Sequence, residues 1–128
     1  CVDITNPKVI RATMGSIYRI PFFYVEDVVS LKQKLQNCGI RFFAAHLQGK
    51  NAYDRESYQG GTAFLIGNEG KGLTDQAADA ADCLIRIPMC GHVESLNAAM
   101  AGGILMYEAA RQRRDLCRDP EGGIRWNR

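Results

Sequence analysis

The sequence predicts an α/β fold in which a mostly parallel sheet is flanked by helices. Three observations lead to this prediction. Short apolar stretches with strand-like composition alternate along the chain with stretches of helical character. Residues that cap helices stand before the helical stretches, and glycines follow several of them. The chain has 128 residues and no repeats, so it is long enough for a single domain with a buried core.

The first elements are a helix and a strand. Asn6-Pro7 is typical of a helix start, which predicts a short helix over residues 8–14 that ends at Gly15. Residues 17–25 are rich in aromatic and β-branched side chains and are predicted to form a strand. Pro21 within this stretch indicates a bend or an edge position.

Two further strands follow an amphipathic helix. Residues 26–37 have an apolar helical face, and Gly39 ends that helix. Residues 40–47 are predicted to form a buried strand, residues 48–61 a polar loop, and residues 62–66 a short apolar strand that runs into Gly67.

The last elements repeat this alternation. Thr74 can cap a short helix over residues 75–81, and residues 83–87 are predicted to form a strand stopped by Pro88. Ser95 can cap a final helix that extends to about Arg113. The tail, residues 115–128, shows no clear periodicity, and residues 1–128 are expected to be one domain.

The loop from Gly67 to Gly72 is the first candidate for a ligand site. Three glycines in six residues let the backbone come close to a ligand, although a tight strand-to-helix turn would use them equally well. Phosphate is disfavoured because no GxxxxGK[ST] spacing is present and because the Glu69 carboxylate would repel an anion. That carboxylate could position a cation, a hydroxyl group or an arginine.

The second candidate loop runs from Ile87 to Asn97 and is unusually apolar. Ser95 can serve simply as the helix cap, whereas Asn97 inside a first turn is a poor helix former whose amide suggests another use. Gly102-Gly103 within the helix suggests close packing against another element or subunit. Both loops follow predicted strands, and ligands of such sheets bind beyond the carboxyl ends of the strands.

Together the two loops resemble the second and third signature motifs of the SpoU (TrmH-like) branch of the SPOUT RNA methyltransferases. The matching residues are GNEGKG and the run from IPM to VESLNAAMAGGILMYEA, and the segment NPKVIRATMG resembles a further conserved helix. The resemblance covers about residues 5–112 and implies a deep trefoil knot of the chain. It also implies S-adenosylmethionine as cofactor, held by Leu47, Gly49, Ile66, Gly67, Ile87, Met89 and Leu96.

The reaction implied by the resemblance is methyl transfer to a ribose 2′-OH of rRNA or tRNA. Glu69, Ser95 and Asn97 would then be the catalytic residues that shape the site. Candidate RNA contacts are Arg11, Arg111, Arg113 and Arg114. The resemblance further implies a homodimer formed through the C-terminal helix.

The family's first motif, Asn-x-Gly-x-x-x-Arg on the first strand and helix, finds no match. Asn6 and Arg11 lack the intervening Gly and align better with the later helix. We therefore expect an N-terminally truncated domain without the first strand and the catalytic Arg. The alternative function is a non-catalytic RNA-binding or dimerisation module that retains the knot.

Composition limits the remaining possibilities. Five widely spaced cysteines without a CxxC pair, and no recognisable signal peptide, indicate reduced thiols and a cytoplasmic location. Two histidines make a poor inventory for a metal site, so none is expected, and no apolar run is long enough for a membrane span. The net charge of +2 has basic ends around an acidic middle, which is compatible with a nucleic-acid surface.

Overall fold

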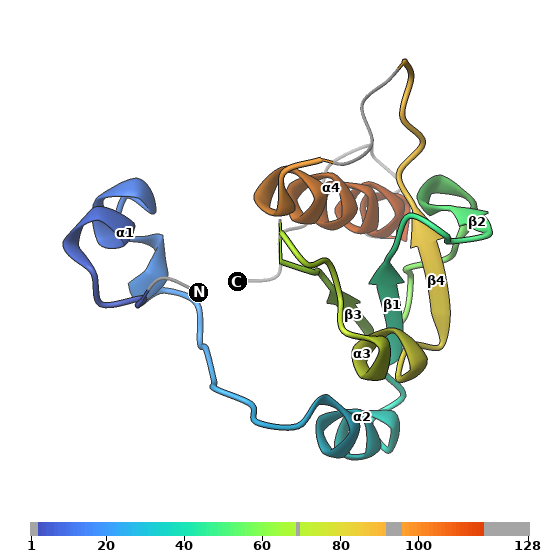
Figure 1. Ribbon diagram of the computed structural model, residues 1–128, viewed down its shortest axis with the longest axis horizontal. Coiled ribbons are helices and arrows are strands. Elements are labelled where there is room, and N and C mark those ends of the chain that lie inside the picture. The colour runs from blue at the N-terminus through green and yellow to red at the C-terminus, as the bar shows by residue number, and fades with distance from the viewer. Residues whose placement is uncertain (1–2, 69, 92–95, 117–128) are drawn as a thin grey trace.

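The structure is a computed structural model that describes residues 3–68, 70–91 and 96–116. In this part of the chain one parallel sheet is formed by β1 (Arg41–Ala45), β2 (Asn51–Ala52), β3 (Thr62–Leu65) and β4 (Cys83–Arg86). The strand order is β2-β4-β1-β3, and each neighbouring pair is parallel (Figure 1). The predicted α/β class with a parallel sheet and flanking helices is confirmed.

The described helices are α1 (Pro7–Ala12), α2 (Val28–Gln36), α3 (Asp75–Asp79) and α4 (Ala98–Leu116), with 3₁₀ turns η1 (Ser16–Tyr18) and η2 (Tyr53–Arg55). Helix α4 lies on one side of the sheet, and α2 and α3 lie on the other (Figure 1). Two predicted caps are confirmed. The Asn6 side chain accepts a hydrogen bond from the Lys8 N–H at 2.9 Å, and the Thr74 hydroxyl accepts one from the Ala77 N–H at 3.2 Å.

The main core lies between the sheet and α4. Phe43, Tyr58, Ile85 and Leu105 are fully buried there. The Tyr58 ring packs edge-on against Phe43, with 4.9 Å between ring centroids. Burial raises the pKa of the Tyr58 hydroxyl, which stays protonated and donates a hydrogen bond to the Tyr53 carbonyl at 2.6 Å.

The carboxyl-terminal half of α4 makes hydrogen bonds to the segment between β2 and β3, a predicted loop that contains η2. The Gln112 side chain accepts from the Tyr58 N–H at 2.8 Å and donates to the Glu56 carbonyl at 2.9 Å. Arg113 Nε donates to the Tyr58 carbonyl at 2.9 Å. These contacts orient α4 across the sheet and therefore place its first turn near the carboxyl ends of the strands.

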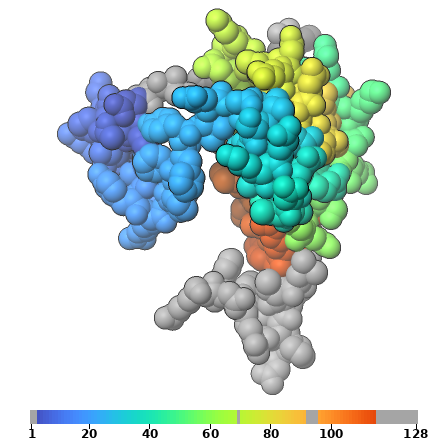
Figure 2. Space-filling model, turned by 90° about the horizontal axis from the view of Figure 1, so that it is seen from below, coloured from blue at the N-terminus to red at the C-terminus, as the bar shows by residue number. Residues whose placement is uncertain are grey.

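The predicted strand over residues 17–25 does not form. Residues 16–18 make η1, and the chain then continues to α2 in an extended stretch that joins none of the described strands (Figure 1). Its aromatic side chains are exposed, Phe23 by 85%. Figure 2 shows the N-terminal residues as a lobe that stands out from the rest of the molecule. An apolar, β-branched composition favours a strand only where a neighbouring strand can pair with it.

The predicted start of the last helix is also wrong. Helix α4 begins at Ala98, and the Asn97 side chain caps it by accepting from the N–H groups of Ala99 at 2.9 Å and Met100 at 3.3 Å. Asn97 therefore takes the capping role predicted for Ser95, which lies outside the described residues. The implied knot involves the connection through residues 92–95, which also lies outside the described residues, so the knot stays a prediction.

Among the helices of the described residues, none combines the length and the apolar character that a membrane span requires.

Candidate functional site

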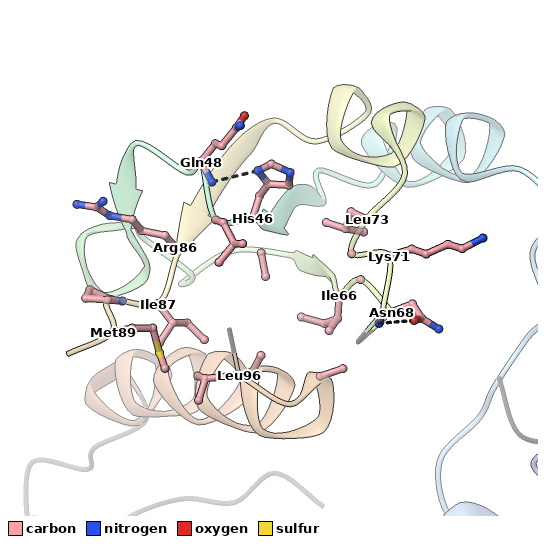
Figure 3. A pocket seen from close by; sticks show the side chains of 18 residues that line it. His46, Gln48, Ile66, Asn68, Lys71, Leu73, Arg86, Ile87, Met89 and Leu96 are labelled. Carbon is pink, nitrogen blue, oxygen red and sulfur yellow. Dashed lines mark hydrogen bonds between the residues drawn. The ribbon is translucent and has the colours of Figure 1, made fainter. Parts of the chain in front are cut away.

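A cavity of about 720 Å³ opens at the carboxyl ends of β1, β3 and β4 (Figure 3). The residues that follow these three strands form most of its wall, and the start of α4 completes it. The lining comprises residues 45–48, 66–68, 70–73, 86–89, 96, 98 and 101. Parallel strands in adjacent positions necessarily bring their following loops together, which is why segments distant in sequence meet here.

The loop after β3 folds back on itself. The Asn68 N–H donates to the Gly72 carbonyl at 3.0 Å, the Gly72 N–H donates to the Asn68 carbonyl at 2.8 Å, and the Asn68 side chain accepts from the Gly70 N–H at 2.7 Å. A Cβ on Gly67 would lie 2.3 Å from the Gly72 carbonyl carbon, so a side chain cannot fit. Gly72 has a φ of 67°, which favours glycine. These glycines are thus needed by the turn, and the turn forms one wall of the cavity.

The segment after β1 forms the opposite wall. The His46 N–H donates to the Ile85 carbonyl at 2.9 Å, which continues the pairing of β1 with β4 beyond the strand end. Leu47 lies at the cavity although it is 68% exposed. Gly49 is buried, and a Cβ there would lie 2.6 Å from the Ile85 carbonyl carbon. Gly49 therefore packs against β4, behind the residues that line the cavity, and its expected part in cofactor binding stays a prediction.

Aliphatic side chains give the cavity an apolar interior. Ile66 and Leu73 point into it from the two ends of the loop after β3, Ile87 points into it from the segment after β4, and Leu96 closes the side next to α4 (Figure 3). Such a lining, combined with nearby main-chain polar groups, suits a flat organic ligand whose edges make hydrogen bonds to the backbone.

The charged side chains among the described lining residues are Lys71 and Arg86. Both reach away from the centre of the cavity in Figure 3. They leave the interior apolar and place positive charge around its mouth, which favours an anionic group at the edge of a ligand or a polyanionic partner outside. In the described residues no group of three or more potential metal ligands is present.

The structure brings together nearly all of the predicted cofactor residues. Leu47, Ile66, Gly67, Ile87, Met89 and Leu96 all line the cavity, whereas Gly49 supports its wall from behind. The structure describes only one of the three predicted catalytic residues. Glu69 and Ser95 lie outside the described residues, and Asn97 sits at the start of α4, directly after Leu96 of the cavity lining.

The four predicted RNA-binding arginines do not line the cavity. Arg111 forms two hydrogen bonds with the buried Glu108, at 2.7 and 2.8 Å, and these bonds lower the pKa of that carboxyl group. Arg113 donates to the carbonyls of Tyr58 and Gly60, and the Arg114 guanidinium lies 5.2 Å from the Tyr107 ring centroid. Arg113 in particular has a structural role, so its replacement would disturb the fold as well as any RNA contact.

Sequence reasoning considered the histidines only as metal ligands and missed His46, which lines the cavity. A signal was available. His46 is the residue before the last in the predicted strand over residues 40–47, and ligands bind at the carboxyl ends of parallel strands. The same argument would have identified Arg86, the last residue of β4.

Comparison with known proteins identifies the family. The model of the SpoU rRNA Methylase family matches residues 1–107 of the chain. The chain belongs to this family. An uncharacterized tRNA/rRNA methyltransferase from Synechocystis is 34% identical to it over 112 residues, a match that covers 88% of the chain and 41% of that protein. The family membership confirms the resemblance carried by the two loops.

Solved structures of methyltransferases match the fold as well. The SpoU methyltransferase AviRb from Streptomyces viridochromogenes, in complex with the cofactor AdoMet, superimposes with a TM-score of 0.80 at 30% identity; the match covers 88% of this chain and 47% of that protein. A structure described as an RNA 2′-O ribose methyltransferase gives a TM-score of 0.78 at 27% identity, covering 88% and 43% of the two chains. The chain thus spans less than half the length of these proteins.

Proposed function

We propose that this chain provides the S-adenosylmethionine pocket of an RNA methyltransferase that acts on a ribose 2′-OH of rRNA or tRNA. The observation that carries the proposal is the cavity at the carboxyl ends of β1, β3 and β4, lined by both signature loops. The relative with AdoMet bound and the relative described as a 2′-O ribose methyltransferase support the choice of cofactor and of acceptor.

The cavity suits this cofactor in size and chemistry. Its volume of about 720 Å³ is within the usual range for sites that enclose a small organic ligand. The aliphatic side chains of Ile66, Ile87 and Leu96 can hold a purine ring, and the backbone beside Gly67 and Leu47 can supply hydrogen bonds to its edge. Bound S-adenosylmethionine would supply an activated methyl group on its sulfonium. The protein would align the acceptor hydroxyl and assist the removal of its proton.

The remaining residues have proposed roles around this pocket. Glu69, Ser95 and Asn97 shape the site and orient the ribose hydroxyl, which distinguishes RNA from DNA. Arg11, Arg111, Arg113 and Arg114 contact phosphate groups. Neutralising Arg11 and Arg114 together should reduce the salt dependence of RNA affinity, because each phosphate contact releases counterions.

A homodimer through α4 is part of the same proposal. Met100, Gly103, Met106 and Tyr107 form an exposed stripe on this helix, with Tyr107 66% exposed. Gly103 has open space where a Cβ would stand, so a second helix could approach closely. Light scattering should give twice the monomer mass for the wild type, and Gly103→Arg should yield the monomer; a monomeric wild type would contradict this part.

Calorimetric titration with S-adenosylmethionine, followed by a radiolabelled methyl-transfer assay on rRNA and tRNA, tests the function. Binding together with transfer to a ribose 2′-OH, located by nuclease resistance of the labelled linkage, supports the proposal. Binding of RNA without binding of S-adenosylmethionine would favour the alternative, a non-catalytic RNA-binding or dimerisation module. Label found on a base would refute the choice of acceptor.

A further inference from the structure

His46 closes a tight turn at the cavity wall. Its ring Nδ1 accepts a hydrogen bond from the Gln48 N–H at 3.2 Å, and its carbonyl accepts one from the Gly49 N–H at 3.0 Å. Its own N–H is bonded to the Ile85 carbonyl of β4. The imidazole therefore acts as the acceptor that an Asn or Asp side chain provides in an Asx-turn.

This hydrogen bond constrains the ring as well as the turn. A nitrogen that accepts an N–H bond carries no proton, so in the neutral imidazole the proton is on Nε2. Figure 3 shows the ring beside the main chain of Gln48, above the aliphatic side chains of the cavity. The ring has two candidate uses: Nδ1 shapes the wall, or the Nε2–H binds a ligand.

The turn itself is clamped against β4. Gly49 fits so closely on the backbone of Ile85 that a Cβ would lie 2.6 Å from the Ile85 carbonyl carbon. Leu47, at the centre of the turn, is 68% exposed and therefore has little packing of its own to hold it. The position of Leu47 at the cavity depends on the hydrogen bonds of the turn, and the one made by a side chain is that of His46.

We infer that His46 is a positioning residue for S-adenosylmethionine: its Nδ1 closes the 46–49 turn and so places Leu47 and its backbone at the cavity wall. The inference rests on the proposed function for the identity of the ligand. A side-chain hydrogen bond of this kind changes an equilibrium about fivefold to tenfold. Removal of the imidazole should weaken S-adenosylmethionine binding by that factor.

Two substitutions distinguish the role of Nδ1 from that of Nε2. In His46→Asn, the side-chain oxygen stands where Nδ1 stood and can accept from the Gln48 N–H. In His46→Gln, the terminal amide lies one bond further out, near the place of Nε2, and cannot close the turn. The full chain is titrated with S-adenosylmethionine in a calorimeter as wild type, as these two variants, and as His46→Ala. Lys50→Ala serves as control, because Lys50 is exposed and does not line the cavity.

The expected result is affinity within about twofold of wild type for His46→Asn and Lys50→Ala, and a loss of about fivefold to tenfold for His46→Ala and His46→Gln. Wild-type affinity in all variants would overturn the inference, and so would rescue by Gln instead of Asn, because the ring would then act through Nε2. Absence of binding by the wild type would instead reject the proposed function. The ¹⁵N chemical shifts of the ring are an independent test without ligand: an unprotonated Nδ1 is expected, and a protonated Nδ1 contradicts the turn.

Discussion

Two aromatic segments of this chain have similar compositions and different structures. Residues 41–45 contain Phe42 and Phe43, form the central strand β1 and are largely buried. Residues 20–25 contain Phe22, Phe23 and Tyr24, and their side chains are exposed. The backbone of β1 pairs with β3 on one side and β4 on the other, whereas residues 20–25 pair with none of the described strands. Pairing, more than composition, separates the two segments.

The largest loss of stability is expected when a buried side chain of β1 is truncated. Phe43→Ala removes a fully buried ring that contacts Tyr58 and Phe64, and it leaves a cavity between the sheet and α4. We expect the free energy of unfolding to fall by about 3–5 kcal/mol, measured by urea denaturation. A loss below about 1 kcal/mol would mean that β1 is no more essential than residues 20–25.

The next largest loss of stability is expected in the loop that follows β3 and lines the cavity. Gly67→Ala places a Cβ 2.3 Å from the Gly72 carbonyl carbon, where only backbone could give way. We expect a loss of about 1–3 kcal/mol in unfolding free energy, together with weaker S-adenosylmethionine binding. Gly60→Ala is the matched control, because nothing lies within 4 Å of the Cβ position at Gly60 and its φ is not positive. Equal effects of the two changes would contradict the close approach.

A smaller effect tests how β1 is anchored. Asp82 accepts from the Phe42 N–H at 2.7 Å and pairs with Lys32 at 2.8 Å. Partial burial alone would raise the pKa of this carboxyl group, but the bonds from Lys32 and Phe42 outweigh it and the pKa is lowered. A carboxyl group with a lowered pKa in the folded state stabilises above its ordinary pKa of about 4, and this stabilisation is lost as the pH falls through the folded value.

Urea midpoints measured from pH 6 down to pH 3 (roughly the range of carboxyl titration) should therefore fall more steeply for the wild type than for Asp82→Asn. Asp27→Asn is the comparison. The pKa of Asp27 is also lowered, by hydrogen bonds from Ser30 and Val29, but this carboxyl group is exposed at the start of α2. Its replacement should flatten the profile less, because exposed charges are screened by water. A larger effect of Asp27→Asn would contradict the anchoring role of Asp82.

The smallest effect is expected in the exposed segment. Phe23→Ala removes a side chain that is 85% exposed, so the unfolding free energy of the chain should change by at most about 0.5 kcal/mol. The same urea experiment as for Phe43→Ala measures the difference. A loss of more than about 2 kcal/mol would show that Phe23 is buried in solution and that the contrast between the two segments is wrong.

Much of the site was predictable because its glycines and strand ends leave local signals. The order of strand, glycine loop and helix around Gly67 is visible in the sequence, and so is the strand that ends before Pro88. The close contact of Gly49 with Ile85 could not be predicted, because it depends on where the turn after β1 lies relative to β4. The position of His46 near the end of a predicted strand was a signal in the sequence, but its role in the turn depends on contacts with the Gln48 N–H and the Ile85 carbonyl that only the folded chain shows.

The α/β class, the helix caps at Asn6 and Thr74 and the two loops were predictable, because each depends on residues that are neighbours along the chain. Three features could be seen only in the folded chain: residues 20–25 stay outside the described sheet, Asn97 caps α4, and His46 closes a turn at the cavity. Each of these depends on contacts between segments: whether a strand has a partner, where α4 is held by its contacts with residues 56–60, and which backbone lies beside Gly49. The residues of a segment set its preference for helix or strand, and packing against other segments determines whether and where that helix or strand forms.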